Sequence, residues 1–279
     1  EWERPCVSGQ LDYETVRQYW DREAGSAAAA SYMAHEQGLP QSCVDDRFAL
    51  EREVVDRWFA GLGPDASVLD IGCGSGAWTA HFALRYARVV GIEQSAPMVA
   101  GARERLSRLS NVELIQGDCL QVPVDGLFQG AFFGGLLMYL NREDVVRVLR
   151  RVSELVPEGK VILRESSGPG RVEVKTGDYQ VAYRSPEEYA DIANEAGLRM
   201  IAVERNRGYA RMEVAVNLVD LVRRVPALRR RDPALVGGLM WRALRLTAPV
   251  TLDLLPNATR LAGIAWPRLA NNFMLLESR

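Results

Sequence analysis

A glycine-rich bend carries the clearest chemistry in this chain of 279 residues. An apolar run ends in Asp70, and Gly72, Gly74 and Gly76 follow at every second position before a helical pattern begins at Ala77. Glycine has no Cβ and tolerates positive φ, so the backbone of such a bend can approach a ligand closely. The spacing is not the G-x-G-x-x-G of dinucleotide-binding folds, and the Lys-Ser/Thr pair of a phosphate-binding P-loop is missing. A ligand of another kind is therefore indicated.

Two further acids end apolar runs after this bend. Glu93 follows the run 89–92 and lies 23 residues after Asp70, and Asp118 comes just after the run 112–116. A carboxylate can accept hydrogen bonds from hydroxyl and amino groups of a ligand, although an acid at a strand end is often only a solvated side chain. In open α/β sheets, ligands bind outside the carboxyl ends of the strands. We therefore expect the bend and both acids to converge.

Strands and helices alternate through the middle of the chain. A helix over 186–197, with Ser185 as its N-cap, precedes a sixth strand over 198–203. This order predicts an α/β fold with a doubly wound, Rossmann-like parallel sheet and helices on both faces. The other predicted strands cover 66–71, 88–92, 112–116, 130–135 and 159–164, and the other predicted helices cover 77–86, 96–108 and 142–155.

The two ends of the chain interrupt this alternation. We expect a helical N-terminal cap over 1–60, a core over 61–206 plus 269–279, and a helical insertion over 207–268. The apolar run 272–277 is expected to be a seventh strand, so the insertion stands before the last strand of a seven-stranded sheet. The alternative is that this strand is absent and that the tail is helical.

The run Val68-Leu69-Asp70-Ile71-Gly72-Cys73-Gly74-Ser75-Gly76, followed by Glu93 and Asp118, resembles the motifs of class I S-adenosylmethionine-dependent methyltransferases. The resemblance covers roughly the predicted core, and it implies S-adenosyl-L-methionine as the cofactor. It implies that Asp70 lies near the methionine ammonium, that Glu93 accepts from the ribose hydroxyls, and that Asp118 accepts from the adenine amino group. It also implies that the last strand is antiparallel and pairs with the sixth.

The same resemblance implies a wider set of cofactor contacts. Gln94 and Met98 are expected to flank the adenine, with Met98 as an apolar cushion. The Cys119 backbone is expected to serve a ring nitrogen, and Gly134 to let the backbone approach the amino-acid end of the cofactor. The complete predicted set is Asp70, Gly72, Cys73, Gly74, Gly76, Glu93, Gln94, Met98, Asp118, Cys119 and Gly134.

Methyl transfer from a sulfonium depends mainly on alignment of the acceptor, and a general base adds less. Candidate bases are Tyr139, after the fourth strand, Glu165, at the end of the fifth, and His35, in the N-terminal cap. A salt bridge to Arg164 is an equally weighted alternative for Glu165, and a structural role is the alternative for His35. Candidates for binding the acceptor are Tyr19, Trp20, Tyr179, Tyr183 and Arg184, for which simple packing is the alternative.

Charge is unevenly distributed along the chain. The net formal charge is −2, but residues 207–268 hold eleven arginines against four acids, a balance of +7, which leaves −9 for the rest. This segment is predicted to be a lid over an amphiphilic or anionic small-molecule acceptor, or the interface of a homo-oligomer. Contact with a membrane surface is a third alternative, ranked below these two. No nucleic-acid partner is expected, because its footprint would be more basic overall.

The cysteines and the apolar runs bear on location. Cys6, Cys43, Cys73 and Cys119 are scattered and form no Cys-x-x-Cys pair, so neither a disulfide framework nor a metal site is expected. A reducing cytoplasm is the expected setting. A signal peptide is not evident, and no stretch approaches the roughly 20 apolar residues of a membrane span.

The function predicted from these observations is methyl transfer from S-adenosylmethionine to an oxygen, nitrogen or carbon atom of a small molecule, in secondary metabolism. One alternative is a methyltransferase that acts on a lipid, glycan or peptide near a membrane. Another is a protein that binds the same cofactor without transferring the methyl group. The motifs address the cofactor, so the identity of the acceptor stays open.

Overall fold

The structure is a computed structural model that describes residues 10–27, 39–168, 172–224, 233–250 and 270–279, with the single residues Leu254, Ala258 and Leu261. The chain divides into two compact units. The first contains Glu1–Ala28, Arg57–Glu204 and Asn272–Arg279, and the second contains Ala29–Asp56 and Arg205–Asn271. The predicted cap over 1–60 thus contributes to both units, and the domain boundaries drawn from the sequence stay a prediction.

A seven-stranded sheet with the order β3-β2-β1-β4-β5-β9-β8 organises the fold. The chain enters at β1 in the middle, winds to one edge through β2 and β3, and then returns to β4 and β5 on the other side of β1. The β1–β2, β2–β3, β1–β4 and β4–β5 pairs are parallel, which confirms the predicted doubly wound sheet. Its strands are β1 (Ser67–Ile71), β2 (Arg88–Glu93), β3 (Val112–Gln116), β4 (Gly130–Phe133), β5 (Lys160–Ser167), β8 (Leu198–Arg205) and β9 (Ala270–Ser278).

The last strand is present and longer than predicted. β9 lies between β5 and β8. The Asn206 amide donates to the Asn271 carbonyl over 2.8 Å, and the Arg279 amide donates to the Gly197 carbonyl over 3.3 Å. Since the residue numbers fall on one strand as they rise on the other, β8 and β9 are antiparallel. In the order of the chain, the helices α8 (Arg207–Arg224) and α9 (Pro233–Pro249) come between β8 and β9, which confirms the helical insertion.

The remaining elements surround this sheet. The helices are α1 (Tyr13–Ala27), α3 (Gln41–Trp58), α4 (Ala77–Ala83), α5 (Ala96–Leu106), α6 (Arg142–Leu155) and α7 (Pro186–Glu195), with a 3-10 turn η1 (Leu137–Tyr139). A two-stranded sheet of β6 (Glu173–Lys175) and β7 (Val181–Tyr183) was not predicted. The helix predicted over 77–86 ends at Ala83, because the Arg85 and Tyr86 amides both turn back to the Phe82 carbonyl.

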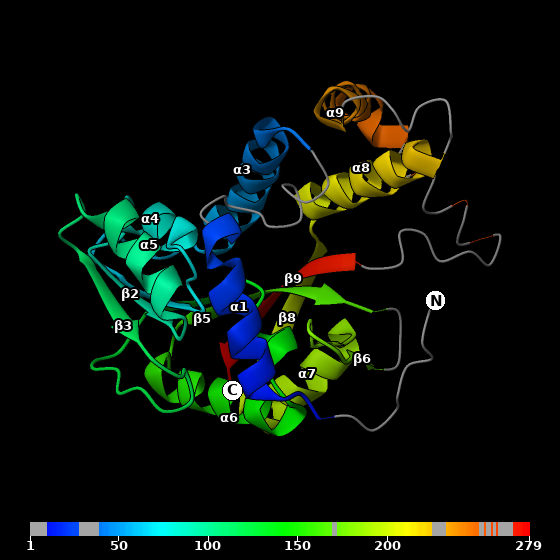
Figure 1. Cartoon of the computed structure of the whole chain (residues 1–279). Coiled ribbons are helices and arrows are strands. Elements are labelled where there is room, and N and C mark those ends of the chain that lie inside the picture. Colours follow the sequence, from blue (N-terminus) through cyan, green and yellow to red (C-terminus); the bar gives the residue numbers. More distant parts are fainter. Residues whose placement is uncertain are drawn as a thin grey trace. The chain divides into compact units, whose positions relative to one another are not determined.

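Side chains of the first unit pack on both faces of its strands, because successive residues of a strand point to opposite sides. Leu69 and Phe133 belong to one buried cluster with residues of α6 and α7, such as Leu149 and Ile192. On the other face, the Phe132 ring lies 4.6 Å from Trp78 of α4. Figure 1 shows α4 and α5 above the strands and α6 and α7 below them.

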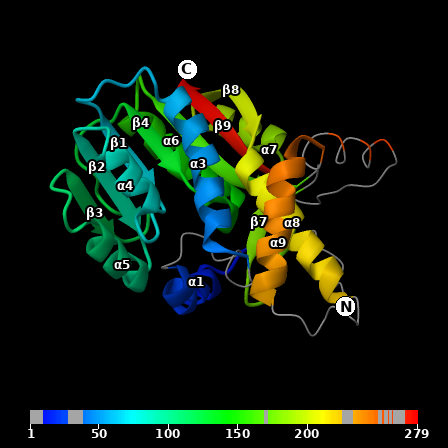
Figure 2. The same ribbon diagram turned by 90° about the horizontal axis from the view of Figure 1, so that it is seen from above.

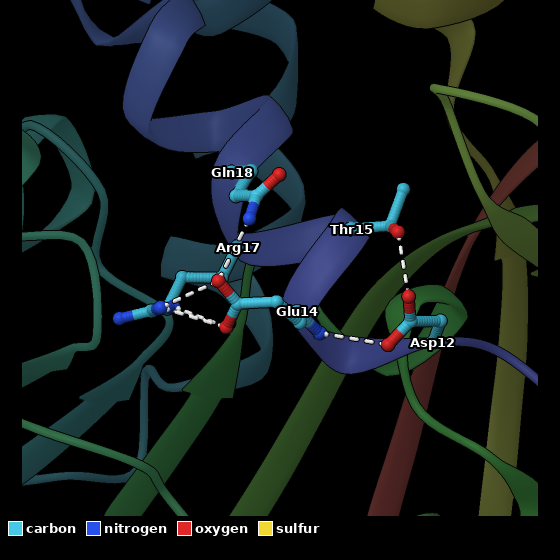
Figure 3. Close-up of polar contacts among 5 residues, drawn as sticks. All are labelled: Asp12, Glu14, Thr15, Arg17 and Gln18. Carbon is cyan, nitrogen blue, oxygen red and sulfur yellow. Dashed lines mark hydrogen bonds and ion pairs between the residues drawn. The ribbon is translucent and has the colours of Figure 1, made fainter.

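The N-terminus of α1 is fixed by a local cap (Figure 3). Asp12 Oδ1 accepts from the Glu14 amide over 3.1 Å, and Oδ2 accepts from the Thr15 hydroxyl over 2.6 Å. The Thr15 hydrogen bond lowers the pKa of Asp12. Glu14 also pairs with Arg17 one turn later, over 2.6 Å. A side-chain acceptor at this position satisfies amides that a helix start leaves unpaired, so α1 begins sharply at Tyr13.

Figure 2 shows α8 and α9 of the second unit side by side, and this unit has a buried core of its own. Cys43 and Val44 from α3, Met212 from α8 and Trp241 from α9 form one buried cluster with neighbouring apolar residues. The Trp241 indole Nε1 donates to Asp46 Oδ2 over 3.0 Å, so α9 is tied to α3 by a polar contact as well. Within the part of the chain that the structure describes, none of the helices has the length and apolarity to cross a bilayer.

Candidate functional site

The glycine bend connects β1 to α4 with a backbone that only glycine adopts readily. Gly72, Gly74 and Gly76 have φ of 72°, 54° and 79°, in the left-handed region that side chains with a Cβ disfavour. A Cβ on Gly72 would lie 3.0 Å from Leu136 Cβ, and one on Gly76 would lie 2.9 Å from Leu106 Cδ1. The Gly72 amide donates to the Ile92 carbonyl of β2 over 2.8 Å. The bend that follows β1 is therefore fixed to the carboxyl end of β2.

Glu93 ends β2 and its carboxylate is fastened to the bend. Oε2 accepts from the Gly74 amide over 3.0 Å, and Oε1 accepts from the Ser95 amide over 2.9 Å. Burial raises the pKa of Glu93, and the two amides oppose that effect. Each carboxylate oxygen has a second lone pair, and the side chain is only partly enclosed. Glu93 can therefore accept from a ligand while it holds the bend in place.

Asp70 lies beneath the same bend and is almost fully buried, with 1% of its surface exposed. Its Oδ2 accepts from the Thr79 hydroxyl of α4 over 2.6 Å. Burial raises the pKa of Asp70 to about 7, and the charge of Glu93 adds to that rise. A cationic group of a ligand would favour the ionised form of this carboxyl, which agrees with the role expected near an ammonium.

The other predicted cofactor residues border the bend to different degrees. A Cβ on Gly74 would lie 3.9 Å from Met98 Sδ, so Met98 adjoins the bend, whereas Gln94 is exposed. Asp118 Oδ1 accepts from the Leu120 amide over 2.9 Å. The preceding Gly117 amide donates to the Glu93 carbonyl over 2.9 Å, which brings the start of the Asp118 loop to the end of β2.

Two cysteines and one glycine complete the predicted set. Cys73 is buried, and a Cβ on Gly91 would lie 3.0 Å from its Sγ. Burial raises the pKa of Cys73 well above its usual range and that of Cys119 to about 12, so both thiols stay neutral. Gly134 follows β4, where a Cβ would lie 3.1 Å from Phe132 Cε1. These positions fit pocket lining rather than nucleophilic chemistry.

Glu165 lies on β5 and holds the turn η1 at its N-terminal end. Its Oε1 accepts from the amides of Leu136 and Leu137 over 3.1 and 3.0 Å, and Oε2 accepts from Met138 over 3.3 Å. The side chain is completely buried, and burial raises the pKa of Glu165 to about 7. Leu136 also packs against Gly72. Glu165 thus anchors a turn that adjoins the glycine bend.

Arg184 holds the other end of the same turn. Its guanidinium donates to the Leu137 carbonyl over 2.9 Å and to the Leu140 carbonyl over 2.6 Å, and 2% of its surface is exposed. The predicted acceptor-binding arginine is therefore engaged with backbone. Tyr183, the residue before it, is buried, and the Lys175 ammonium lies 5.2 Å from its ring centre.

Four aromatic residues gather beside this turn, and we name Tyr19, Trp20, Tyr139 and Tyr179 the aromatic cluster. The hydroxyls of Tyr139 and Tyr179 lie 3.0 Å apart. The Trp20 ring lies 5.3 Å from Tyr139, and the Tyr19 ring lies 5.1 Å from Tyr179. Burial raises the pKa of Tyr139 well above its usual range. The structure thus brings together four predicted residues from three separate segments.

Two polar contacts that the sequence did not reveal hold α1 over this region. Just before α1, Asn141 Oδ1 accepts from the Leu11 amide over 2.8 Å, and in the middle of α1 Asp21 Oδ1 accepts from the Ser95 hydroxyl over 2.6 Å. Asn141 and Ser95 both precede helices, which is typical of N-caps, yet neither side chain caps its own helix. A position before a helix favours a local role, so these long-range contacts carry no signal in the sequence. His35, the third candidate base, lies outside the described residues.

Residues 68–159 match the family described as "Methyltransferase domain". The 2-phytyl-1,4-naphtoquinone methyltransferase of Thermosynechococcus vestitus is 37% identical over 113 residues, which are 39% of this chain and 49% of that protein. Matching curated relatives also include ribosomal RNA small subunit methyltransferases. The chain spans half or less of the length of these relatives.

Solved structures share the architecture over more of the chain. The DhpI–SAH complex superposes with a TM-score of 0.55 and 22% identity, covering 69% of this chain and 90% of that chain. The [4+2]-cyclase SpnF superposes with a TM-score of 0.63 and 18% identity, covering 97% of this chain and 99% of that chain. Identities this low show a common fold. The glycine bend and Glu93 both fall within the matched residues 68–159, so this part of the chain is a methyltransferase domain.

Proposed function

We propose that this protein transfers a methyl group from S-adenosylmethionine to an oxygen, nitrogen or carbon atom of a small molecule. The observation that carries this proposal is the Glu93 carboxylate, fixed on the Gly74 amide of a bend in which Gly72 and Gly76 leave no room for a Cβ. The cofactor, when bound, supplies an activated methyl group on its sulfonium. What remains for the protein is to bind, to align and to exclude water.

The arrangement around the bend supports roles for four of the predicted cofactor residues. Glu93 has lone pairs left for the ribose hydroxyls, and Met98 offers an apolar surface beside Gly74. Asp70, whose charged form is disfavoured by burial, is suited to an ammonium neighbour. Asp118 is proposed for the adenine amino group, because its loop follows β3 and starts beside the end of β2.

The aromatic cluster is proposed to face the acceptor. Leu136 packs on Gly72 and precedes the turn that carries Tyr139, so the cluster adjoins the cofactor side. Aromatic rings bind flat apolar groups well, and this favours an acceptor with an aromatic or apolar portion. The prediction of an amphiphilic acceptor agrees with such a surface, and that of an anionic group has no separate support in the first unit.

Glu165, one of the candidate bases, is better suited to positioning the turn η1 than to accepting a proton. Both of its carboxylate oxygens are occupied by backbone amides of the turn that carries Tyr139. Tyr139 stays protonated near neutral pH because burial raises its pKa, so it is suited to orient an acceptor by a hydrogen bond. We therefore propose alignment, without an obligatory base, as the main source of rate.

The proposal also covers the cellular location of the protein and the role of its second unit. A cytoplasmic setting is supported by the free state of Cys43, Cys73 and Cys119, the cysteines that the structure describes. A lid over the acceptor and a subunit interface are the two roles proposed for residues 207–268.

Calorimetric titration of the folded protein with S-adenosylhomocysteine tests the binding part of this proposal. We expect one site per chain, and absence of heat from folded material would overturn it. Incubation with methyl-labelled S-adenosylmethionine and a panel of quinols, phenols and amines tests transfer. A labelled product whose formation requires Glu93 supports the proposal.

A second candidate is a rearrangement that uses the same pocket without methyl transfer. The specific observation in its favour is the likeness over nearly the whole chain to a structure described as a [4+2]-cyclase. Tight binding of S-adenosylhomocysteine without any labelled product across the panel would favour this candidate over methyl transfer.

A further inference from the structure

Helix α9 has two apolar faces, and only one of them is buried. Trp241 and Leu244 have 2% of their surface exposed and belong to the core of the second unit. On the opposite side, Leu239 is 60% exposed, Leu246 is 85% exposed, and Val250, just after the helix, is 53% exposed. These residues and the exposed Ala243 are spaced by four, three and four positions, so they follow one side of a helix. We name Leu239, Ala243, Leu246 and Val250 the α9 stripe.

The α9 stripe is not needed to complete the core of its own unit. The buried side of α9 already packs on the cluster with Met212 and Val44, and Trp241 donates to Asp46. A row of exposed leucines costs free energy in water, and contiguous exposed apolar surface marks sites of contact with a partner or a membrane. The stripe therefore favours contact with an external partner.

The charge around the stripe indicates which partner. Helix α9 contains no acidic residue. Of its two arginines, Arg245 lies 3.5 Å from Asp46, and Arg242 is exposed next to the stripe. In the sequence, Arg229, Arg230 and Arg231 precede the helix, and residues 207–268 carry a balance of +7. A second copy of this chain seated on the α9 stripe would bring like charges together, which opposes association at this face, so the subunit interface proposed for residues 207–268 would use another face. A surface with negative charge matches both the arginines and the leucines.

We propose that the α9 stripe docks flat on an anionic lipid surface. In this arrangement, Leu239 and Leu246 enter the boundary between headgroups and acyl chains, and the exposed Arg242 contacts lipid phosphates. Helix α9 lies in the plane of the interface and does not cross the bilayer, in agreement with its limited length and apolarity. The proposal concerns a surface of the second unit and does not rest on methyl transfer.

Co-sedimentation of the whole protein with vesicles tests this proposal. One set of vesicles contains phosphatidylcholine alone, and the other contains phosphatidylcholine with phosphatidylglycerol. We expect binding to the anionic set, with an affinity that falls as salt is added because screening weakens the arginine contacts. The double variant L239E/L246E is expected to lose roughly tenfold or more of this affinity, since both apolar anchors are gone and two negative charges are added.

The matched control is the double variant L84E/L127E. Leu84 and Leu127 are 73% and 60% exposed, lie in the first unit and are comparable to Leu239 and Leu246 in exposure. This control should bind the anionic vesicles as the unchanged protein does. Circular dichroism and the affinity for S-adenosylhomocysteine establish that both double variants stay folded, independently of any catalytic activity.

Three results would overturn the proposal. The first is failure of the unchanged protein to bind anionic vesicles. The second is equal binding by L239E/L246E and the unchanged protein. The third is self-association in analytical ultracentrifugation that requires Leu239 and Leu246 while no vesicle binds, which would assign the stripe to a second copy of the chain.

Discussion

Glu93 and Glu165 occupy corresponding places on two strands of one sheet, yet they are surrounded differently. Each lies at or near the carboxyl end of a parallel strand, and each accepts hydrogen bonds from backbone amides of a loop that follows a neighbouring strand. Glu93 accepts from two amides and remains partly enclosed, whereas Glu165 accepts from three amides and is completely buried. The carboxylate of Glu93 can accept a further hydrogen bond from a ligand. The carboxylate of Glu165 is enclosed by the protein and is not accessible to a ligand.

The two acids have the same chemistry, but the surroundings of Glu93 suit ligand binding, whereas those of Glu165 suit support of the fold. A buried carboxylate is costly unless it is hydrogen-bonded, and Glu165 meets that requirement by shaping the turn that carries Tyr139. Glu93 meets it only in part, so an incoming hydroxyl donor would add a favourable contact. The following predictions test whether the two acids divide the work in this way.

Glu165→Ala should have the largest effect. We expect the free energy of unfolding to fall by about 3–5 kcal/mol, because three buried amides lose their acceptor. Denaturant titration measures this, and Glu165→Gln is the matched control, since it keeps one acceptor oxygen and should lose less. Unchanged stability together with abolished turnover would instead make Glu165 a catalytic base.

Glu93→Ala should act on the ligand more than on the fold. We expect the affinity for S-adenosylhomocysteine to drop roughly 10–100-fold, as charged hydrogen bonds to the ligand are lost. Isothermal calorimetry measures this, with Glu113→Ala as a control, because Glu113 lies on the neighbouring strand and pairs only with Arg88 in the described contacts. Equal affinities in all three proteins would refute the assignment of the ribose contact.

Stability should depend on pH through the buried acids. Burial raises the pKa of Glu165 and of Asp70 to about 7, against about 4 in an unfolded chain. The stabilisation from a raised acid pKa is complete below about pH 4 and is lost as the pH rises through about 7, because the folded state must then hold a buried charge.

We therefore expect the free energy of unfolding to fall across this interval, and to fall less in Glu165→Gln, by about 1–2 kcal/mol. Denaturant titrations at a series of pH values check this. Identical slopes in Glu165→Gln, Asp70→Asn and the unchanged protein would contradict the assigned burial effect.

Tyr139→Phe should have the smallest effect on stability. The variant removes one hydrogen bond to Tyr179, so we expect a loss of about 1 kcal/mol or less. Turnover should decrease while the affinity for S-adenosylhomocysteine is unchanged, and Tyr179→Phe should behave alike if the pair acts together. A Tyr139→Phe variant with full turnover would remove Tyr139 from the acceptor site.

The sequence predicted most of the sheet and the cofactor side of the site. The strands β1 to β5 and the final strand were recognisable because each is a short apolar run bounded by glycine or polar residues. The bend was recognisable because its three glycines are required by local backbone geometry at positive φ. Such features depend on neighbours in the chain, so they are visible in the order of residues.

Only the tertiary structure decides which hydrogen-bond partners Glu165, Arg184 and Asn141 have. Glu165 binds a turn 27–29 positions away, and Asn141 binds Leu11 across 130 positions. Both side chains also fitted other roles, a catalytic base and a helix cap, and nothing near them in the chain distinguishes the two. Propensity and spacing determine elements and local turns, whereas the partner of a buried polar group is selected by whichever distant backbone must be satisfied when the core closes.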